Sequence, residues 1–77
     1  MRVKILPPYG CDRSALDERN WAEMPEGGTV ADALELVKCS RVKARLLLVS
    51  VNGERAEMDT KLKNGDVVGF FMPIAGG

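Results

Sequence analysis

The stretch "NGDVVGFFMPIAGG" (Asn64–Gly77) closes the sequence and decides how it is interpreted. Its first three residues are typical of a turn, and the apolar run at 67–72 predicts a β-strand. Pro73 biases the residue before it toward an extended conformation, so the chain should leave this strand straight. The two final glycines carry no side chains. We therefore expect a strand followed directly by a narrow, flexible tail over residues 73–77.

A carboxylate at the tip of such a tail has a definite chemical use. A free carboxylate is a poor acyl donor because its negative charge repels nucleophiles, whereas adenylation with ATP makes it reactive toward sulfur or an amine. Gly76 and Gly77 can thread a channel too narrow for a side chain, and Ile74 and Ala75 can fill apolar sub-sites of a partner. The chain has no histidine and no phosphate-cradling glycine loop. We expect a carrier or substrate that a partner enzyme activates, not a catalyst.

The segments before the tail contain one clear helix and one clear hairpin. Thr29, with Asp32 three residues later, forms a capping-box pattern ahead of "VADALELVKC", which predicts a helix over residues 30–39. Asn52-Gly53 is a two-residue turn signal between the apolar run "LLLVSV" at 46–51 and a return strand at 54–58. Residues 41–45, which carry three basic side chains, are expected to connect the helix to this hairpin.

The first third of the chain adds two strands. Val3 and Ile5 alternate with basic residues and predict a half-buried strand that Pro7-Pro8 ends. A second short strand is expected at 21–24, after a loop. The order is then strand, strand, helix, strand, strand, strand. We predict an α+β protein with a mixed sheet of about five strands over one main helix, which is a ubiquitin-like β-grasp if the first and last strands pair centrally.

Strand parity separates core residues from residues on the open face of the sheet. In the strand at 46–51 the inward set is Leu47, Val49 and Val51, because Ser50 should face water. In the last strand Phe70 should point inward with Val68, since the alternate set contains a glycine and would fill a core poorly. Leu62 should plug the core under a turn. The residues expected to bind a partner are Leu48, Phe71, Met72, Pro73, Ile74 and Ala75.

Composition sets the outer limits of function. Seventy-seven residues predict one domain spanning 1–77, and the 11 basic and 11 acidic side chains balance, which argues against nucleic acid or an anionic membrane as a partner. Cys11 and Cys39 match no zinc or CxxC spacing, so we expect free thiols, with a disulfide as the alternative. No apolar run is long enough to span a bilayer. We expect a soluble cytoplasmic protein with no bound cofactor or metal.

The segment at 64–77 resembles the C-terminal signature of the MoaD/ThiS-like sulfur carriers, and is most similar to the small subunit of molybdopterin synthase. "PEGGTVADALELV" (Pro25–Val37) is similar to the family's helix start, and "VNGE" (Val51–Glu54) to its hairpin. The aromatic pair at 70–71, with proline before the aliphatic-Ala-Gly-Gly ending, favours the molybdopterin branch over the thiamine branch.

The resemblance implies that a ThiF/MoeB-type adenylyltransferase uses ATP to activate the Gly77 carboxylate, which then becomes a thiocarboxylate. A MoaE-like large subunit would receive the tail and use the sulfur to build molybdopterin, for the molybdenum or tungsten cofactor. Gly76 would reach the active site with Gly77, and Phe71 matches the family's exposed aromatic residue at partner interfaces. Three alternatives stay open: a carrier for another pathway such as thiamine, a ubiquitin-like modifier conjugated through Gly77, and a non-covalent binding module.

Overall fold

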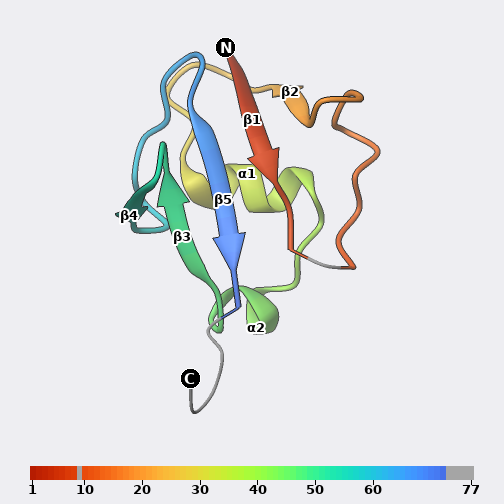
Figure 1. Cartoon of the computed structure of the whole chain (residues 1–77), viewed down its shortest axis with the longest axis vertical. Helices are drawn as coiled ribbons and strands as arrows, with labels where there is room; N and C mark the ends of the chain where they lie inside the picture. Colours follow the sequence, from red (N-terminus) through yellow and green to blue (C-terminus); the bar gives the residue numbers. More distant parts are fainter. Residues whose placement is uncertain (9, 73–77) are drawn as a thin grey trace.

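The computed structural model describes residues 1–8 and 10–72. Five strands form one sheet in the order β2-β1-β5-β3-β4, and α1 packs against one of its faces (Figure 1). The central strands β1 and β5 are parallel, and the other neighbouring pairs are antiparallel. The predicted β-grasp arrangement is therefore confirmed. The strands are β1 (Arg2–Leu6), β2 (Trp21–Glu23), β3 (Leu48–Val51), β4 (Glu54–Ala56) and β5 (Val67–Phe71).

Helix α1 (Val30–Leu36) begins where the capping box predicts. The Thr29 hydroxyl accepts a hydrogen bond from the Asp32 N–H at 3.4 Å, and the Asp32 carboxylate accepts one from the Thr29 N–H at 2.9 Å. The helix ends at Leu36, however, and not at residue 39. Lys38 adopts a left-handed backbone with φ of 53°, and the Cys39 N–H reaches back to the Leu34 carbonyl at 3.2 Å. A left-handed residue past the helix end is usually glycine, so a lysine at this position does not predict the early stop.

The β3–β4 hairpin forms at the predicted turn and is tied to the centre of the sheet. Asn52 and Gly53 both have positive φ, 54° and 84°, as a type I′ turn requires. The Asn52 side chain also accepts a hydrogen bond from the Val67 N–H at 2.9 Å and donates one to the Asp66 carboxylate at 2.9 Å. The hairpin turn therefore fixes the start of β5 as well as its own two strands.

The segment expected to be a plain connector contains a short helix, α2 (Arg41–Ala44). The Ser40 hydroxyl accepts a hydrogen bond from the Lys43 N–H at 3.1 Å and so caps the start of this helix. The Leu47 N–H then bonds to the Ala44 carbonyl at 3.2 Å, so β3 starts at Leu48 instead of residue 46. The return strand is also shorter than predicted and ends at Ala56.

The core lies between the sheet and α1, and parity predicted its main members correctly. Leu47, Val49, Leu62, Val68 and Phe70 are all buried, and Val51 packs against them while half-buried. The fully buried side chains come from both layers: Val3, Ile5, Val30, Ala33, Val37 and Val68. Because these residues fill one face of the sheet, the other face remains open at the end where β5 finishes.

Candidate functional site

Four elements meet at one end of the molecule. The parallel strands β1 and β5 both finish there, β3 begins there because it runs antiparallel to β5, and α2 lies beside them (Figure 1). Met72 follows β5 at this end and is the last residue that the structure describes. Five of the predicted site residues lie outside the described residues: Pro73, Ile74, Ala75, Gly76 and Gly77.

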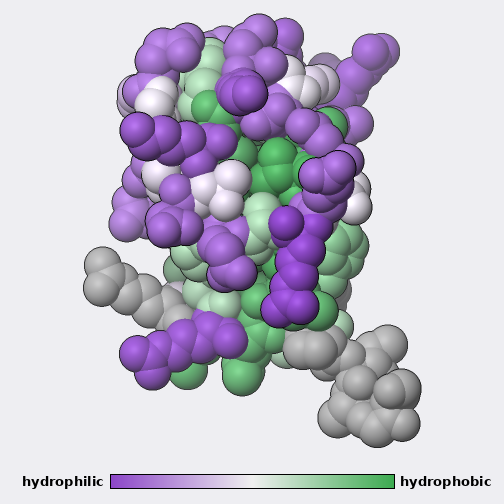
Figure 2. All heavy atoms as spheres, turned by 90° about the vertical axis from the view of Figure 1, so that its left-hand side faces the viewer, coloured by the Kyte–Doolittle hydropathy of each residue, from purple (hydrophilic) through white to green (hydrophobic). Residues whose placement is uncertain are grey.

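Exposed apolar side chains concentrate at this same end. Among residues 1–8 and 10–72, the large hydrophobic side chains left exposed belong to β1, β3, β5, α2 and the residues next to them. Seen from the β3–β4 side, hydrophilic residues cover most of the upper part, whereas hydrophobic residues show through the middle and at the lower end, between hydrophilic side chains (Figure 2). We call this set the apolar end surface: Leu6, Val42, Leu46, Leu48, Phe71 and Met72.

Phe71 is the aromatic member of the apolar end surface, and Gly69 determines where its ring lies. A Cβ added at Gly69 would stand 3.0 Å from Cζ of Phe71 and 3.0 Å from Oγ of Ser50. The ring therefore folds back along the open face of β5 into the space that the glycine leaves. Phe71 keeps 53% of its surface exposed, so it is half supported by the sheet and half available to a partner.

The neighbours of Phe71 are set by strand register. Leu48 is its partner across β3, and Leu6 is paired with Gly69 across β1. Both leucines therefore flank the ring on the open face. The prediction that Leu48 and Phe71 share this face is confirmed. Met72 is also exposed, although strict alternation along the strand would point its side chain inward. Because β5 ends at Phe71, the alternation no longer applies to Met72.

Sequence reasoning missed three members of the apolar end surface. Leu6 precedes Pro7-Pro8 and was taken only as the end of a strand. Val42 was hidden in a segment expected to be a basic connector, yet it is 77% exposed on α2. Leu46 was placed on the outward side of a strand, but it lies in the turn that joins α2 to β3. Ser40, as a possible N-cap, was the signal that would have predicted α2 and thereby placed Val42 and Leu46.

The described part of the chain offers no cluster of catalytic or metal-binding groups. No three His, Cys, Asp or Glu residues gather within residues 1–8 and 10–72 to hold a metal ion. The carboxylates with perturbed titration are turn residues. The Ser14 N–H holds the pKa of Asp12 below its ordinary value, and the Trp21 and Arg19 N–H groups do the same for the pKa of Asp17.

The comparisons with known proteins agree with this geometry. The family model described as "ThiS family" matches residues 12–77, which is most of the chain and includes β5 and the segment after it. The chain belongs to the ThiS family. A search of curated proteins finds no match for this family member.

Two solved structures share the fold of this ThiS-family protein. One is the thiamine biosynthesis protein ThiS from Geobacter metallireducens, with TM-score 0.66, 24% identity and full coverage of both chains. The other is SAMP1 from Haloferax volcanii, with TM-score 0.62, 21% identity, and coverage of 100% of this chain and 98% of that one. These likenesses establish the ubiquitin-like β-grasp and no more.

Membership of the family places the protein among small sulfur carriers that are not enzymes themselves. Carriers of this type work with an adenylyltransferase and with a second enzyme that accepts the sulfur. Within the described residues, no helix is long and apolar enough to cross a membrane.

Proposed function

We propose that this protein carries sulfur on its C-terminal residue, with the Gly77 carboxylate as the reacting group and the apolar end surface as its docking site. The observation that carries the proposal is that the apolar end surface lies at the end of the strand that leads to Gly77. The exposed large hydrophobic side chains surround the point where the chain leaves β5, five residues before Gly77. A carrier must present a reactive end to an enzyme, and a docking area around Met72, where the described chain ends, suits that task.

The spacing suits delivery into a buried active site. Each extended residue advances the chain by at most about 3.3–3.6 Å, so five residues after Met72 carry the carboxylate roughly 17 Å beyond the apolar end surface. A partner can therefore bind that surface on its outside while the tail passes inward. Pro73 favours an extended start, Ile74 and Ala75 offer apolar contacts, and Gly76 and Gly77 pass a narrow channel.

The proposed chemistry has two steps, and the partner supplies the catalytic groups for both. The Gly77 carboxylate attacks the α-phosphate of ATP, which releases pyrophosphate and leaves an acyl-adenylate. Sulfide from the sulfur donor then attacks the acyl carbon, displaces AMP and leaves a thiocarboxylate. A ThiF/MoeB-type adenylyltransferase is the expected first partner, and ATP is bound by that enzyme and not by the carrier.

For the sulfur acceptor we propose a MoaE-like large subunit that builds molybdopterin, in the cytoplasm. Support comes from the pair at 70–71, buried Phe70 and exposed Phe71, followed by proline and the aliphatic-Ala-Gly-Gly ending. Thiamine synthesis is the second candidate acceptor pathway, favoured by the ThiS family model and by the name of the Geobacter structure.

The deciding experiment measures the intact mass of the protein after incubation with its adenylyltransferase, ATP and a sulfur donor. The proposal predicts the gain produced by exchanging one oxygen for sulfur, located at Gly77 by peptide mapping. A chain lacking Gly77 is the control and should stay unmodified. An unchanged wild-type mass would refute the carrier function, and isopeptide adducts to lysines in host extracts would indicate a modifier instead.

The loaded protein then identifies the acceptor. Mixed with a MoaE-like subunit and cyclic pyranopterin monophosphate, it should lose its sulfur and yield molybdopterin. Loss of sulfur only with the thiamine-pathway acceptor would move the protein to that pathway.

A further inference from the structure

Two thiols that are distant in the sequence lie next to each other in the fold. Cys11 and Cys39 are free, half-buried and packed against the core. Burial, together with the Cys11 thiol beside it, holds the pKa of the Cys39 thiol above its ordinary value. The Cys39 thiol donates a hydrogen bond to the Ser40 carbonyl at 3.7 Å. The sequence spacing gave no sign of this pairing, because the contact is made by the loop before β2 folding against the end of α1.

Contacts on either side hold the two cysteines together. The Asp12 N–H donates to the Val37 carbonyl at 2.9 Å, and the Asp12 carboxylate lies 3.3 Å from the Lys38 ammonium group. Cys11 is adjacent to Asp12, and Cys39 is adjacent to Lys38. A disulfide needs neighbouring backbones and side chains directed at each other. Here the contacts of Asp12 with Val37 and Lys38 bring the two backbones together beside both cysteines.

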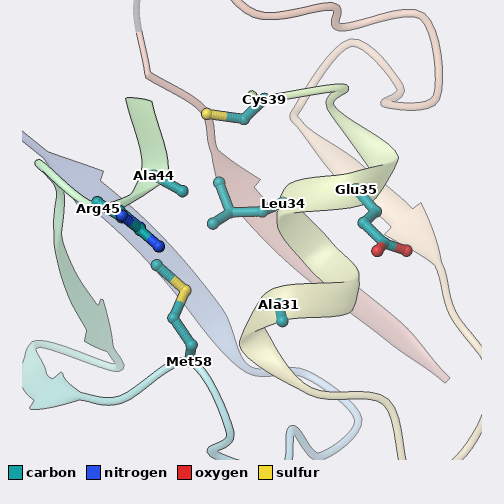
Figure 3. Close-up of a pocket in the computed structure, with 7 residues that line it drawn as sticks. All are labelled: Ala31, Leu34, Glu35, Cys39, Ala44, Arg45 and Met58. Atoms are coloured by element: carbon teal, nitrogen blue, oxygen red, sulfur yellow. The ribbon is translucent and has the colours of Figure 1, made fainter. Parts of the chain in front are cut away.

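The Cys39 thiol is also open to a small reagent. A hollow of about 320 Å³ lies between α1, α2 and the loop after β4, and Cys39 stands at one end of it, beyond Leu34 (Figure 3). Its lining is mainly apolar: Ala31, Leu34, Glu35, Cys39, Ala44, Arg45 and Met58. Neither cysteine is fully buried, so a small disulfide can reach the pair without the core opening.

We propose that Cys11 and Cys39 form a reversible intramolecular disulfide by exchange with a small-molecule disulfide such as oxidised glutathione. One cysteine attacks the reagent as its thiolate, forms a mixed disulfide and releases one glutathione thiol. The other cysteine then attacks the mixed disulfide at the protein sulfur and releases the second glutathione. The protein loses two hydrogen atoms in total, and these leave on the two reduced glutathione molecules.

The order of attack follows from the surroundings of Cys39. Burial and the Cys11 thiol beside it raise the pKa of Cys39 above its ordinary value. The thiolate is the attacking form, so the raised pKa makes Cys39 a slower first attacker than it would otherwise be. The first mixed disulfide is expected at Cys11, and Cys39 closes the ring.

Closing this bond joins the loop before β2 to the junction between α1 and α2. It also limits the freedom of the unfolded chain, as a cross-link closing a loop of this length does. The oxidised protein should melt at least about 10 °C higher than the reduced one. The junction leads directly into α2, which carries Val42 of the apolar end surface, so oxidation fixes a segment beside that surface.

The test uses the full chain with a free Gly77 carboxylate, because a thiocarboxylate would itself react with disulfides. The protein is incubated with oxidised glutathione, free thiols are alkylated, and intact mass and melting temperature are measured. The expected product is a monomer lighter by two hydrogen atoms, with Cys11 and Cys39 in one cross-linked peptide and a raised Tm that dithiothreitol reverses.

The variants Cys11→Ser and Cys39→Ser identify the roles of the two thiols. Each should take up one glutathione and form no internal bond, and the adduct on Cys39→Ser should form faster because it tests Cys11 alone. Two glutathione adducts on the wild-type chain, or disulfide-linked dimers without the internal cross-link, would overturn the proposal. The wild-type result decides the matter even if a variant folds poorly, and none of these readouts depends on sulfur-carrier activity.

Discussion

Replacing Phe71 with alanine should weaken binding to the adenylyltransferase by about two orders of magnitude at most. A phenylalanine side chain offers about 200 Å² of surface, and Phe71 is 53% exposed, so a partner can bury about 100 Å² of it. At about 25 cal/mol per Å² this contributes about 2.5 kcal/mol, or about a 70-fold increase in Kd. The remaining half of the ring already lies against the sheet and contributes to folding instead.

The assay is calorimetric titration of the carrier into the adenylyltransferase, with unfolding curves to confirm that each variant is folded. Val67→Ala is the matched control, because it shortens an aliphatic side chain on the open face of the same strand, at the end far from Met72. Repeating the comparison on chains that lack residues 73–77 separates docking from tail insertion. If docking and tail insertion contribute independently, the ratio of the Kd of the variant to the Kd of the wild type should be the same with and without the tail.

An increase in Kd of less than about threefold for Phe71→Ala would refute the assignment of the apolar end surface as the docking site. Equal losses for Phe71→Ala and Val67→Ala would do so as well, since they would show a general effect on the sheet.

Three further changes test the fold around the site. Gly69→Ala should push the Phe71 ring off the sheet, because the new Cβ would lie 3.0 Å from it. We expect the affinity for the adenylyltransferase to fall tenfold or less. The free energy of unfolding should change by less than about 1 kcal/mol. Thr29→Ala should lower the unfolding free energy by about 1 kcal/mol in urea denaturation, and Thr29→Ser should restore it. The pKa of Asp17 is lower in the folded state than its ordinary value of 3.8, so the ionised carboxylate stabilises the fold at pH values above 3.8. This stabilisation is lost as the pH falls through the folded-state pKa. Asp17→Asn should therefore make the free energy of unfolding less dependent on pH in this acid range, and an unchanged pH dependence would show that the Asp17 carboxylate does not stabilise the turn.

The parts of the fold that the sequence predicted are those that local chemistry fixes. Thr29 and Asp32 bond to each other's backbone three residues apart, and Asn52-Gly53 occupies a backbone conformation that few other pairs tolerate. Such signals need no knowledge of the rest of the chain. The sulfur-carrier family was accessible for a related reason, because its signature is one continuous segment at the end of the sequence.

Some of what was missed is local, and the rest depends on contacts across the fold. Lys38 takes a left-handed conformation that its residue type does not advertise, and this shortens α1 and frees the segment that becomes α2. Leu6 joins Phe71 only because β1 and β5 pair in parallel, which brings their two ends together. The meeting of Cys11 with Cys39 likewise follows from where the loop before β2 packs. No short stretch of sequence contains both Leu6 and Phe71, or both Cys11 and Cys39.

The size of the apolar end surface suits a protein that must leave its partners. Its side chains are mostly half-exposed, so by themselves they offer roughly 500 Å² to a partner, and they reach the 800 Å² or so per side of a standard stable interface only with polar contacts around them. A carrier that binds first an activating enzyme and then an acceptor needs a surface that each can occupy in turn. The tail must supply the rest of the affinity, since ordering its glycines costs about 1–2 kcal/mol per residue, which only a matching channel offsets. Binding through the apolar end surface alone is therefore weak. The apolar end surface and the tail together select the enzymes that accept the chain end.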